Sequence, residues 1–301
     1  MATKVPAYSY DGTSSSEVRN GYWYIYLKTT GTKAFTMAYA KTGVEVCIVG
    51  GGAGGRAYST IHDQGEDGGG GGTVLNKTGV SIAAGTVYPI TVGAGGSLST
   101  WSSTGGWHGE GGEGGASSAF GFTAAGGQTG KGNAGLSKTD ADATAGGAGT
   151  YAFGDTSLPR YGGGGGGGAD DWYKPGAGGA GGGGRGGYGK AAGKTDSASA
   201  NAIAGAANTG GGGGGAGEGY AEGYDNAVSG NAAKGGSGIV IIRGTEDDFL
   251  PVYFNGTQLS EIYFNGEKLA GLIYGGTRIF ARVMAWIRGR IGLDTGEVVP
   301  A

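Results

Sequence analysis

The stretch VCIVGGGAGG, residues 46–55, decides the fold of this chain. Four apolar residues run directly into Gly50-Gly51-Gly52-Ala53-Gly54-Gly55. A strand followed by G-x-G-x-x-G also opens dinucleotide-binding folds, in which a helix must begin behind the last glycine. The next residues, RAYSTIHDQGEDGGGGG, have no apolar period of 3.6 residues and end in glycines, which are unfavourable inside a helix. The sequence therefore predicts a strand that continues into a glycine structure, and no nucleotide site.

Glycine dominates the composition, with 78 of 301 residues, whereas proline contributes only 6. Charged residues make up 15% and aromatic residues 10%, which is unlike a solvated disordered tail. The net charge of -3 gives no electrostatic footprint for nucleic acid. The single cysteine, Cys47, excludes an internal disulfide, and its place in an apolar run indicates a small core residue.

Neither a metal site, a cofactor site nor a catalytic site is predicted. The two histidines, His62 and His108, lack clustered cysteine or aspartate partners. The stretch GKAAGKT, residues 189–195, is one residue short of a P-loop and follows no strand. The calcium-loop spacing is absent, and the following acids are interpreted as solvated: Asp63, Glu66, Asp67, Asp170 and Asp171. Paired carboxylates for glycan hydrolysis stay open, because any two acids can meet in space.

No segment for membrane insertion or secretion is predicted. The chain has no run of 18 apolar residues, and its first residues, MATKVPAYSYDG, lack the apolar centre of a signal peptide. We therefore expect the protein to be made in a cytoplasm and to leave it, if at all, by another route such as lysis.

Short apolar and aromatic runs predict an all-β fold for residues 1–244. Residues 1–49 are typical of strands throughout, and no convincing amphipathic helix is found up to residue 250. Strands are predicted at 22–28, 33–40, 44–50, 87–96, 117–127 and 237–244. The continuous apolar run of residues 239–242 favours a strand that is buried on both faces.

Between these strands lie glycine tracts at 68–72, 162–168, 181–184 and 210–215. Backbone groups in an ordered tract must find hydrogen-bond partners. Collagen is excluded, because glycine has no strict period of three and proline is scarce. The tracts therefore predict packed polyglycine II helices, with three residues per turn, that project from a strand-rich, sandwich-like base and carry loops at their far end.

The C-terminal part differs from the rest of the chain. After a linker at 245–251, three ten-residue copies follow: VYFNGTQLSE (252–261), IYFNGEKLAG (262–271) and LIYGGTRIFA (272–281). Asn-Gly between apolar runs predicts β-hairpins, which are too short to bury a core alone. Residues 252–301 are therefore predicted to form a hairpin repeat segment for oligomerisation or attachment. Further strands over 282–301 and a short helix over 279–288 both stay open.

The order of the motifs resembles the glycine-rich domain of bacteriophage tail and adhesin proteins. The motifs are VCIVGGGAGG (46–55), ITVGAGG (90–96), SSAFGFTAAGG (117–127), NTGGGGGG (208–215) and GGSGIVIIRG (235–244). The resemblance covers residues 8–244, and the FNG repeats are similar to C-terminal segments of phage tail proteins. It implies a polyglycine-helix sandwich that binds a host cell-surface receptor, a glycan or a protein, through distal loops. It implies no catalytic residues and no cofactor.

The resemblance implies a tail-fibre or tail-tip adhesin, a virion component with other tail proteins as partners. The short hairpin repeats need partners of their own, from which we expect a homotrimer. The alternative is a purely structural appendage of the tail or capsid without receptor specificity. A polysaccharide-degrading fibre enzyme is less favoured, because neither a long repetitive β-helix nor an acidic cleft is visible.

Aromatic residues in the loops between glycine tracts are the candidate receptor contacts, since aromatic platforms with polar neighbours suit glycan and protein receptors. They are Trp101, Trp107, His108, Tyr151, Phe153, Tyr161, Trp172, Tyr173, Tyr220 and Tyr224. Trp107 and Trp172 stand out, because each lies in a polar stretch without apolar neighbours in sequence. The alternative for each residue is that its ring covers a glycine helix.

Overall fold

The computed structural model divides the chain into two compact units. One is Val5–Gly244, and the other combines Met1–Lys4 with Thr245–Ala301. Described are residues 5–57, 65–99, 109–137, 141–170, 173–189, 201–217 and 231–245, together with the backbone of four short strands between 252 and 268. The described glycine tracts and the two five-stranded sheets all belong to the larger unit.

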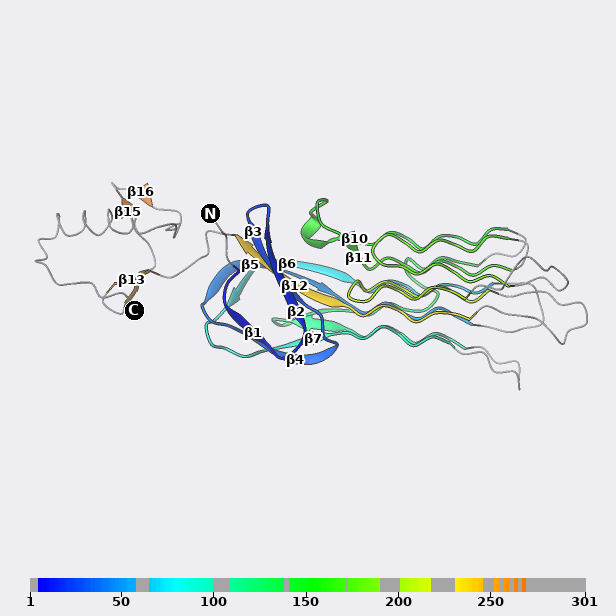
Figure 1. Ribbon diagram of the computed structural model, residues 1–301, viewed down its shortest axis with the longest axis horizontal. Helices are drawn as coiled ribbons and strands as arrows, with labels where there is room; N and C mark the ends of the chain where they lie inside the picture. The colour runs from blue at the N-terminus through cyan, green and yellow to red at the C-terminus, as the bar shows by residue number, and fades with distance from the viewer. Residues whose placement is uncertain are drawn as a thin grey trace, which may run out of the picture. The chain divides into compact units, whose positions relative to one another are not determined.

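Two five-stranded antiparallel sheets form the strand-based part of the larger unit (Figure 1). The first has the order β1 (Tyr8–Tyr10), β4 (Gly31–Met37), β7 (Tyr88–Val92), β8 (Ser117–Ala119), β9 (Phe122–Ala124). The second has the order β2 (Ser14–Arg19), β3 (Tyr22–Leu27), β12 (Ile239–Thr245), β5 (Lys41–Val49), β6 (Val74–Ile82). β12, the last strand of the unit, therefore lies between β3 and β5 at the centre of the second sheet.

The second sheet is buried on both faces at its centre. Across the β12–β5 pair, Ile241 lies opposite Cys47 and Val240 opposite Ile48. All four side chains are at most 1% exposed. Because successive side chains of a strand point to opposite faces, Cys47 and Ile48 face opposite sides of the sheet. This confirms that the run 239–242 is a strand buried on both faces and that Cys47 is a core residue.

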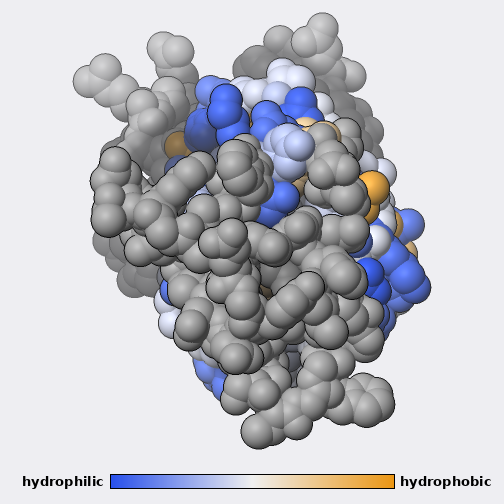
Figure 2. All heavy atoms as spheres, turned by 90° about the vertical axis from the view of Figure 1, so that its right-hand side faces the viewer, coloured by the Kyte–Doolittle hydropathy of each residue, from blue (hydrophilic) through white to orange (hydrophobic). Residues whose placement is uncertain are grey.

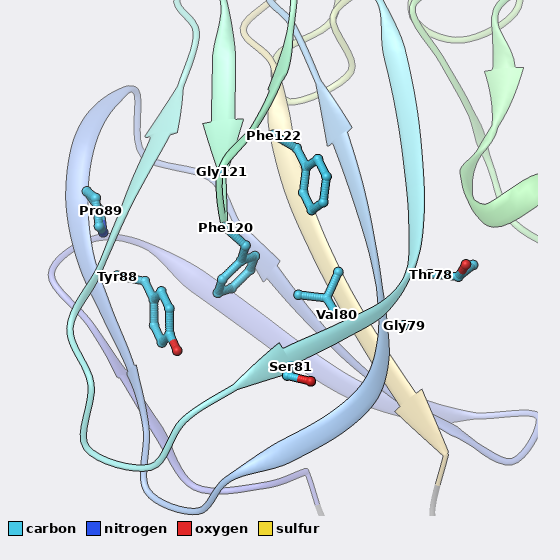
Figure 3. A pocket seen from close by; sticks show the side chains of 9 residues that line it. All are labelled: Thr78, Gly79, Val80, Ser81, Tyr88, Pro89, Phe120, Gly121 and Phe122. Atoms are coloured by element: carbon cyan, nitrogen blue, oxygen red, sulfur yellow. The ribbon is translucent and has the colours of Figure 1, made fainter.

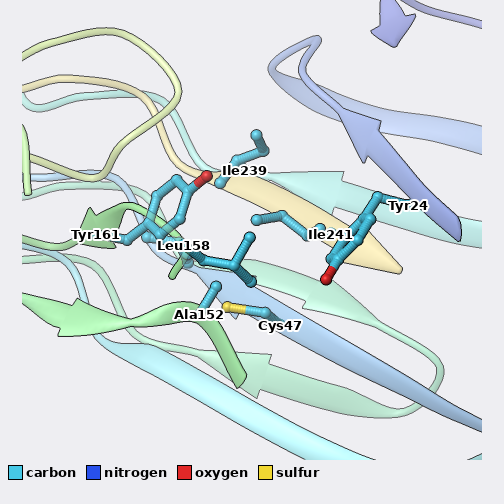
Figure 4. Close-up of a cluster of buried hydrophobic side chains, with 8 residues drawn as sticks. Tyr24, Cys47, Ala152, Leu158, Tyr161, Ile239 and Ile241 are labelled. Atoms are coloured by element: carbon cyan, nitrogen blue, oxygen red, sulfur yellow. The ribbon is translucent and has the colours of Figure 1, made fainter. Parts of the chain in front are cut away.

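One face of this sheet is covered by a short segment that sequence reasoning did not predict. It contains β10 (Thr150–Tyr151), the 3-10 turn η1 (Ala152–Gly154) and β11 (Arg160–Tyr161). Figure 4 shows the buried cluster that it forms with the sheet: Tyr24, Cys47, Val49, Ala152, Leu158, Tyr161, Ile239 and Ile241. The burial of Cys47 here raises the pKa of its thiol to about 12.

The all-β prediction is confirmed, and η1 is the only helical element among the described residues. The strands predicted at 22–28, 33–40, 44–50, 87–96 and 237–244 correspond to β3, β4, β5, β7 and β12. The stretch 117–127 is a hairpin of β8 and β9 rather than one strand. Strand β6 escapes prediction, because Asn76-Lys77-Thr78-Gly79 interrupts its apolar residues.

The glycine tracts continue from the strands and run side by side away from them (Figure 1). Residues 50–57 show how a tract is held, because their N–H groups donate to three neighbouring tracts in turn. The donor–acceptor pairs are Gly50–Thr73, Ala53–Gly70 and Arg56–Asp67; Gly51–Gly115, Gly54–Gly112 and Ala57–Gly109; and Gly52–Gly236 and Gly55–Ala233, at N···O distances of 2.9–3.1 Å. The repeat of three residues is the period expected of an extended helix with three residues per turn.

Glycine content separates inner tracts from outer tracts. Residues 50–55, 162–168 and 210–215 are buried throughout. Outer tracts instead expose a side chain at every third position, as in Glu110, Glu113 and Ala116, in Asp142, Ala145 and Ala148, and in Lys174, Ala177 and Ala180. At Gly165, in an inner tract, a Cβ atom would lie 2.0 Å from the carbonyl oxygen of Gly213. These fully buried tracts are therefore almost entirely glycine, whereas the outer tracts carry a non-glycine residue at every third position.

The smaller unit contains two described hairpins. β13 (Val252–Phe254) pairs antiparallel with β14 (Thr257–Leu259), and β15 (Tyr263–Phe264) pairs with β16 (Glu267–Lys268). In sequence, Asn-Gly separates the strands of each pair, as expected of an Asn-Gly turn. The third copy, 272–281, and the remaining C-terminal residues lie outside the described part of the chain.

Candidate functional site

Successive glycine tracts run alternately away from the strands and back to them. Residues 50–57 leave β5, and residues 65–73 return to β6. The antiparallel hydrogen bonds of this pair place Arg56 and Asp67 together at the end away from the strands, called here the far end. The same alternation brings to the far end the described residues that flank 58–64, 100–108, 138–140, 171–172, 190–200 and 218–230. Segments distant in sequence therefore begin and end at one end of the lattice.

Six of the ten predicted contact residues fall in those segments and lie outside the described residues: Trp101, Trp107, His108, Trp172, Tyr220 and Tyr224. Tyr173 is described and half-buried at the far end. Its N–H group donates to Oδ1 of Asp170 at 3.1 Å. The Asp170 side chain is only 6% exposed, which corrects its interpretation as a solvated acid.

Tyr151, Phe153 and Tyr161 do not lie in a loop at the far end. They belong to β10, η1 and β11 beside the second sheet. Tyr161 is 7% exposed and packs in the core cluster, so its ring faces protein rather than a receptor. The rings of Tyr151 and Phe153 stack on guanidinium groups, those of Arg160 and Arg243, with 4.2 Å from each ring centroid to the guanidinium carbon. The rings of Phe153 and Tyr161 thus pack the covering segment on the sheet, whereas the ring of Tyr151 packs on Arg160 within the segment itself.

A charged hollow near the far end was not foreseen from the sequence. Arg56 is one of its lining residues, with Nη2 at 2.5 Å from Oε1 of Glu110 and Nη1 at 3.6 Å from Oδ2 of Asp67. The hollow has a volume of about 300 Å³, and its lining includes Arg56, Glu110, Glu113, Gln128 and Lys131. Asp67 is thus ion-paired rather than simply solvated. The available signal was the spacing of Glu110 and Glu113, three residues apart, which puts both on one face of a tract with this period.

Where Figure 2 shows coloured residues around the rim of this view, hydrophilic ones outnumber hydrophobic ones. The charged hollow itself is lined by hydrogen-bond donors and acceptors, which suit a polar ligand.

Glu66 is the strongly perturbed acid in this region. Burial is the largest cause that raises the pKa of its carboxyl, the negative charge of Asp67 adds to it, and Arg56 opposes it, so that the pKa rises from 4.5 to about 7. The folded protein therefore keeps a proton that the unfolded chain releases above about pH 4.5. Stability contributed by this carboxyl is greatest below pH 4.5 and is lost as the pH rises to about 7.

Glu66→Gln should remove this pH dependence, because the amide mimics the protonated carboxyl. We expect the melting temperature of the wild type, relative to that of the variant, to fall between pH 4.5 and 7. Thermal unfolding at pH 4.5, 6 and 8 measures the difference. Glu113→Gln, at an exposed acid of an outer tract, is the matched control and should follow the wild type. Parallel curves for wild type and Glu66→Gln would contradict the expectation.

The glycines of residues 50–55 do not form a phosphate cradle. Each N–H group of this stretch already donates to a backbone carbonyl of a neighbouring tract. A Cβ on Gly52 would lie 2.1 Å from the carbonyl oxygen of Gly211, so a neighbouring tract fills the space that a pyrophosphate would need. The stretch is part of the lattice interior.

Within the described ranges, no group of three or more His, Cys, Asp or Glu side chains is arranged to hold a metal ion. Among the helices of the described part, none is long and apolar enough to cross a membrane.

Comparison with known proteins bears on the glycine-rich part of the chain. The sequence model of a family described as a glycine-rich domain matches residues 28–245, more than half of the chain. No curated protein matches the sequence. The matched range runs from the end of β3 to the end of β12 and includes every tract of the lattice.

Proposed function

This chain belongs to the glycine-rich domain family, and from that premise we propose that it is a bacteriophage tail-fibre or tail-tip adhesin that binds a host cell-surface receptor. The phage setting is supported by the order of sequence motifs from VCIVGGGAGG to GGSGIVIIRG. In this proposal the protein is a virion component that is made in the host cytoplasm, and it has no catalytic role.

One observation carries the proposal: several segments that connect outgoing and returning tracts begin and end at one end of the lattice. Binding residues commonly lie on loops that a rigid scaffold positions. The lattice is such a scaffold, since inner tracts such as 50–57 donate hydrogen bonds to three neighbours. By sequence, the connecting segments carry Trp101, Trp107, His108, Trp172, Tyr220 and Tyr224. Tryptophan and tyrosine are the residue types enriched where interfaces gain most of their binding energy.

The smaller unit supplies the proposed attachment. Its hairpins β13–β14 and β15–β16 are too short to bury a core alone, which supports pairing with copies of this chain or with other tail proteins. A homotrimer is the proposed assembly. In this proposal the receptor is bound at the far end of the glycine tracts.

The proposal is tested with purified, fluorescently labelled protein on a panel of bacterial strains, with mass photometry on the same sample. Saturable binding to one host, together with protection of that host from infection by the cognate phage, is the expected result. An oligomer that binds no strain would point instead to a structural appendage of the virion. Release of reducing sugars from the surface glycans of a bound host would point to a fibre enzyme.

Trp107→Ala and Trp172→Ala should each lower cell binding by about thirtyfold or more, because loss of a central aromatic contact costs about 2 kcal/mol or more. Thermal unfolding of both variants should match that of the wild type. Tyr39→Ala is the matched control, since this ring is 42% exposed on the strand-based part of the larger unit. Normal binding by both tryptophan variants would show that these segments are not the contact.

A further inference from the structure

A second hollow lies on the strand-based part of the larger unit, away from the glycine tracts. It is formed by β6, β7 and the β8–β9 hairpin and has a volume of about 500 Å³ (Figure 3). This volume lies within the range of small-molecule sites. Its lining includes Val80, Ser81, Tyr88, Pro89, Phe120 and Phe122. The mixture of aromatic rings with a few hydroxyl groups is the usual composition of such sites.

The aromatic rings of the hollow contact one another and neighbouring side chains, which fix their positions. The ring centroids of Tyr88 and Phe120 are 5.1 Å apart with planes inclined at 61°, an edge-on arrangement. Phe120 also meets the fully buried Phe35 edge-on, at 6.1 Å and 84°. On the other side, the ammonium group of Lys77 lies 5.1 Å from the ring centroid of Phe122. These contacts fix the rings, while Tyr88, Phe120 and Phe122 each stay partly exposed.

The hairpin turn at Phe120 is unusual for its residue type. Phe120 and Gly121 have φ values of 51° and 83°, and Asn20 and Gly21, between β2 and β3, have 51° and 77°. Asparagine is the favoured residue in this left-handed position, and a bulky ring is uncommon there. The turn itself therefore does not account for Phe120, so its contacts must. Phe35 and Tyr88 meet part of the ring, and the remainder borders the hollow.

We propose that this hollow binds a neutral pyranose ring of a glycan. The apolar face of a pyranose packs on aromatic rings such as Phe120, while its hydroxyl groups need donors and acceptors at the rim. Ser81, an exposed residue of β6, belongs to the lining. The Tyr88 hydroxyl accepts the Ala83 N–H at 2.9 Å and remains a donor to a ligand oxygen beside it. The lining contains no charged side chain, and the ammonium group of Lys77 lies against the ring of Phe122 without belonging to the lining, which favours an uncharged ligand.

The site is tested on the full chain by saturation-transfer difference NMR with methyl β-D-glucopyranoside, methyl α-D-mannopyranoside and N-acetylglucosamine. N-acetyltryptophanamide serves as an apolar probe. Ring-proton signals from at least one sugar are the expected result. A signal from N-acetyltryptophanamide alone would identify the hollow as a contact for a protein side chain and overturn the proposal. The absence of any signal would also overturn it.

Phe120→Asn is the decisive variant, because it places the turn-favoured residue at this φ and removes the ring. We expect the sugar affinity to fall about tenfold or more while the chain stays folded. Phe122→Leu is the second variant, in case Phe120→Asn does not fold, and should weaken binding as well. Tyr39→Ala, outside the hollow, should bind as the wild type does. Unchanged affinity in folded Phe120→Asn and Phe122→Leu would refute the site.

This inference is independent of the proposed receptor contact at the far end. Trp107→Ala and Trp172→Ala should lose cell binding and keep the sugar signal, whereas Phe120→Asn should do the reverse. The two proposals can therefore fail separately.

Discussion

Gly52→Val is expected to abolish folding of the larger unit. A Cβ at this position would lie 2.1 Å from the carbonyl oxygen and 2.4 Å from the carbonyl carbon of Gly211, both in the backbone of a neighbouring tract. Backbone atoms cannot turn aside as a flexible side chain can, so whole tracts would have to separate. Gly52 also donates to Gly236 and accepts from Gly96, and separation would strain these bonds. We expect a loss of about 3 kcal/mol or more, a large part of the stability of an ordinary domain.

The matched control adds a valine where the lattice meets solvent. Ala145→Val introduces the same side chain at an exposed position of an outer tract and should change the free energy of unfolding by about 0.5 kcal/mol or less. Thermal unfolding and limited proteolysis compare the two variants. Equal melting temperatures would refute the assignment of Gly52 to a packed interior.

A binding measurement tests whether the G-x-G-x-x-G pattern of residues 50–55 forms a dinucleotide site. Folded wild-type protein should show no specific affinity for NAD or FAD by calorimetry, because the N–H groups of residues 50–55 are already bonded. Specific binding of either dinucleotide would overturn this interpretation.

Much of the strand-based part follows from the sequence, because burial leaves a strong pattern in it. The run 239–242 could be assigned to a buried strand, and the end of β5 at Val49 could be located where apolar residues give way to glycine. Strand β6 could not be predicted from the sequence, because it is partly exposed and contains Gly79 with a φ of 71°. Local propensity is a weak guide to such a strand, which owes its place to pairing with β5.

The order of the glycine tracts is a different case. Gly51 and Gly52 are chemically identical, yet they donate to different neighbours, Gly115 and Gly236. Only the position within the period of three separates them, and glycine has no side chain to mark that position. In outer tracts the sequence does show which positions face solvent, because Glu110, Glu113 and Ala116 occur at every third residue and are exposed.

The candidate contact residues were predicted by residue type and neighbourhood, which cannot separate a binding ring from a packing ring. Tyr161 and Phe153 lie next to glycine in sequence, as a loop aromatic would. Their partners, Cys47 and Arg243, are distant in the chain and belong to the second sheet. Contacts between such distant positions leave no local pattern, so the covering segment could be recognised only in three dimensions.

Arg243→Met should release that covering segment from the sheet. The Arg243 side chain is 9% exposed and forms ion pairs with Glu45 and, at 3.4 Å, with Asp155. Its guanidinium group also lies over two rings, 4.5 Å from the centroid of Tyr22 and 4.2 Å from that of Phe153. Methionine keeps the length of the side chain but leaves Glu45 without its cation. Since Glu45 is partly exposed, we expect a cost of about 2 kcal/mol, below that of a fully buried pair.

Cys47 reports on this release, because it is the only cysteine of the chain and lies in the cluster under Ala152. If Arg243 holds η1 on the sheet, its loss makes local opening easier by about 2 kcal/mol, and the thiol should react with a disulfide reagent roughly thirtyfold faster. Arg243→Lys keeps the charge but not the flat group that stacks on both rings, so its rate should be intermediate. The rate of thiol reaction in Arg243→Met is compared with the rate that global unfolding of the variant alone would give. If the two rates are equal, the segment and the sheet open together.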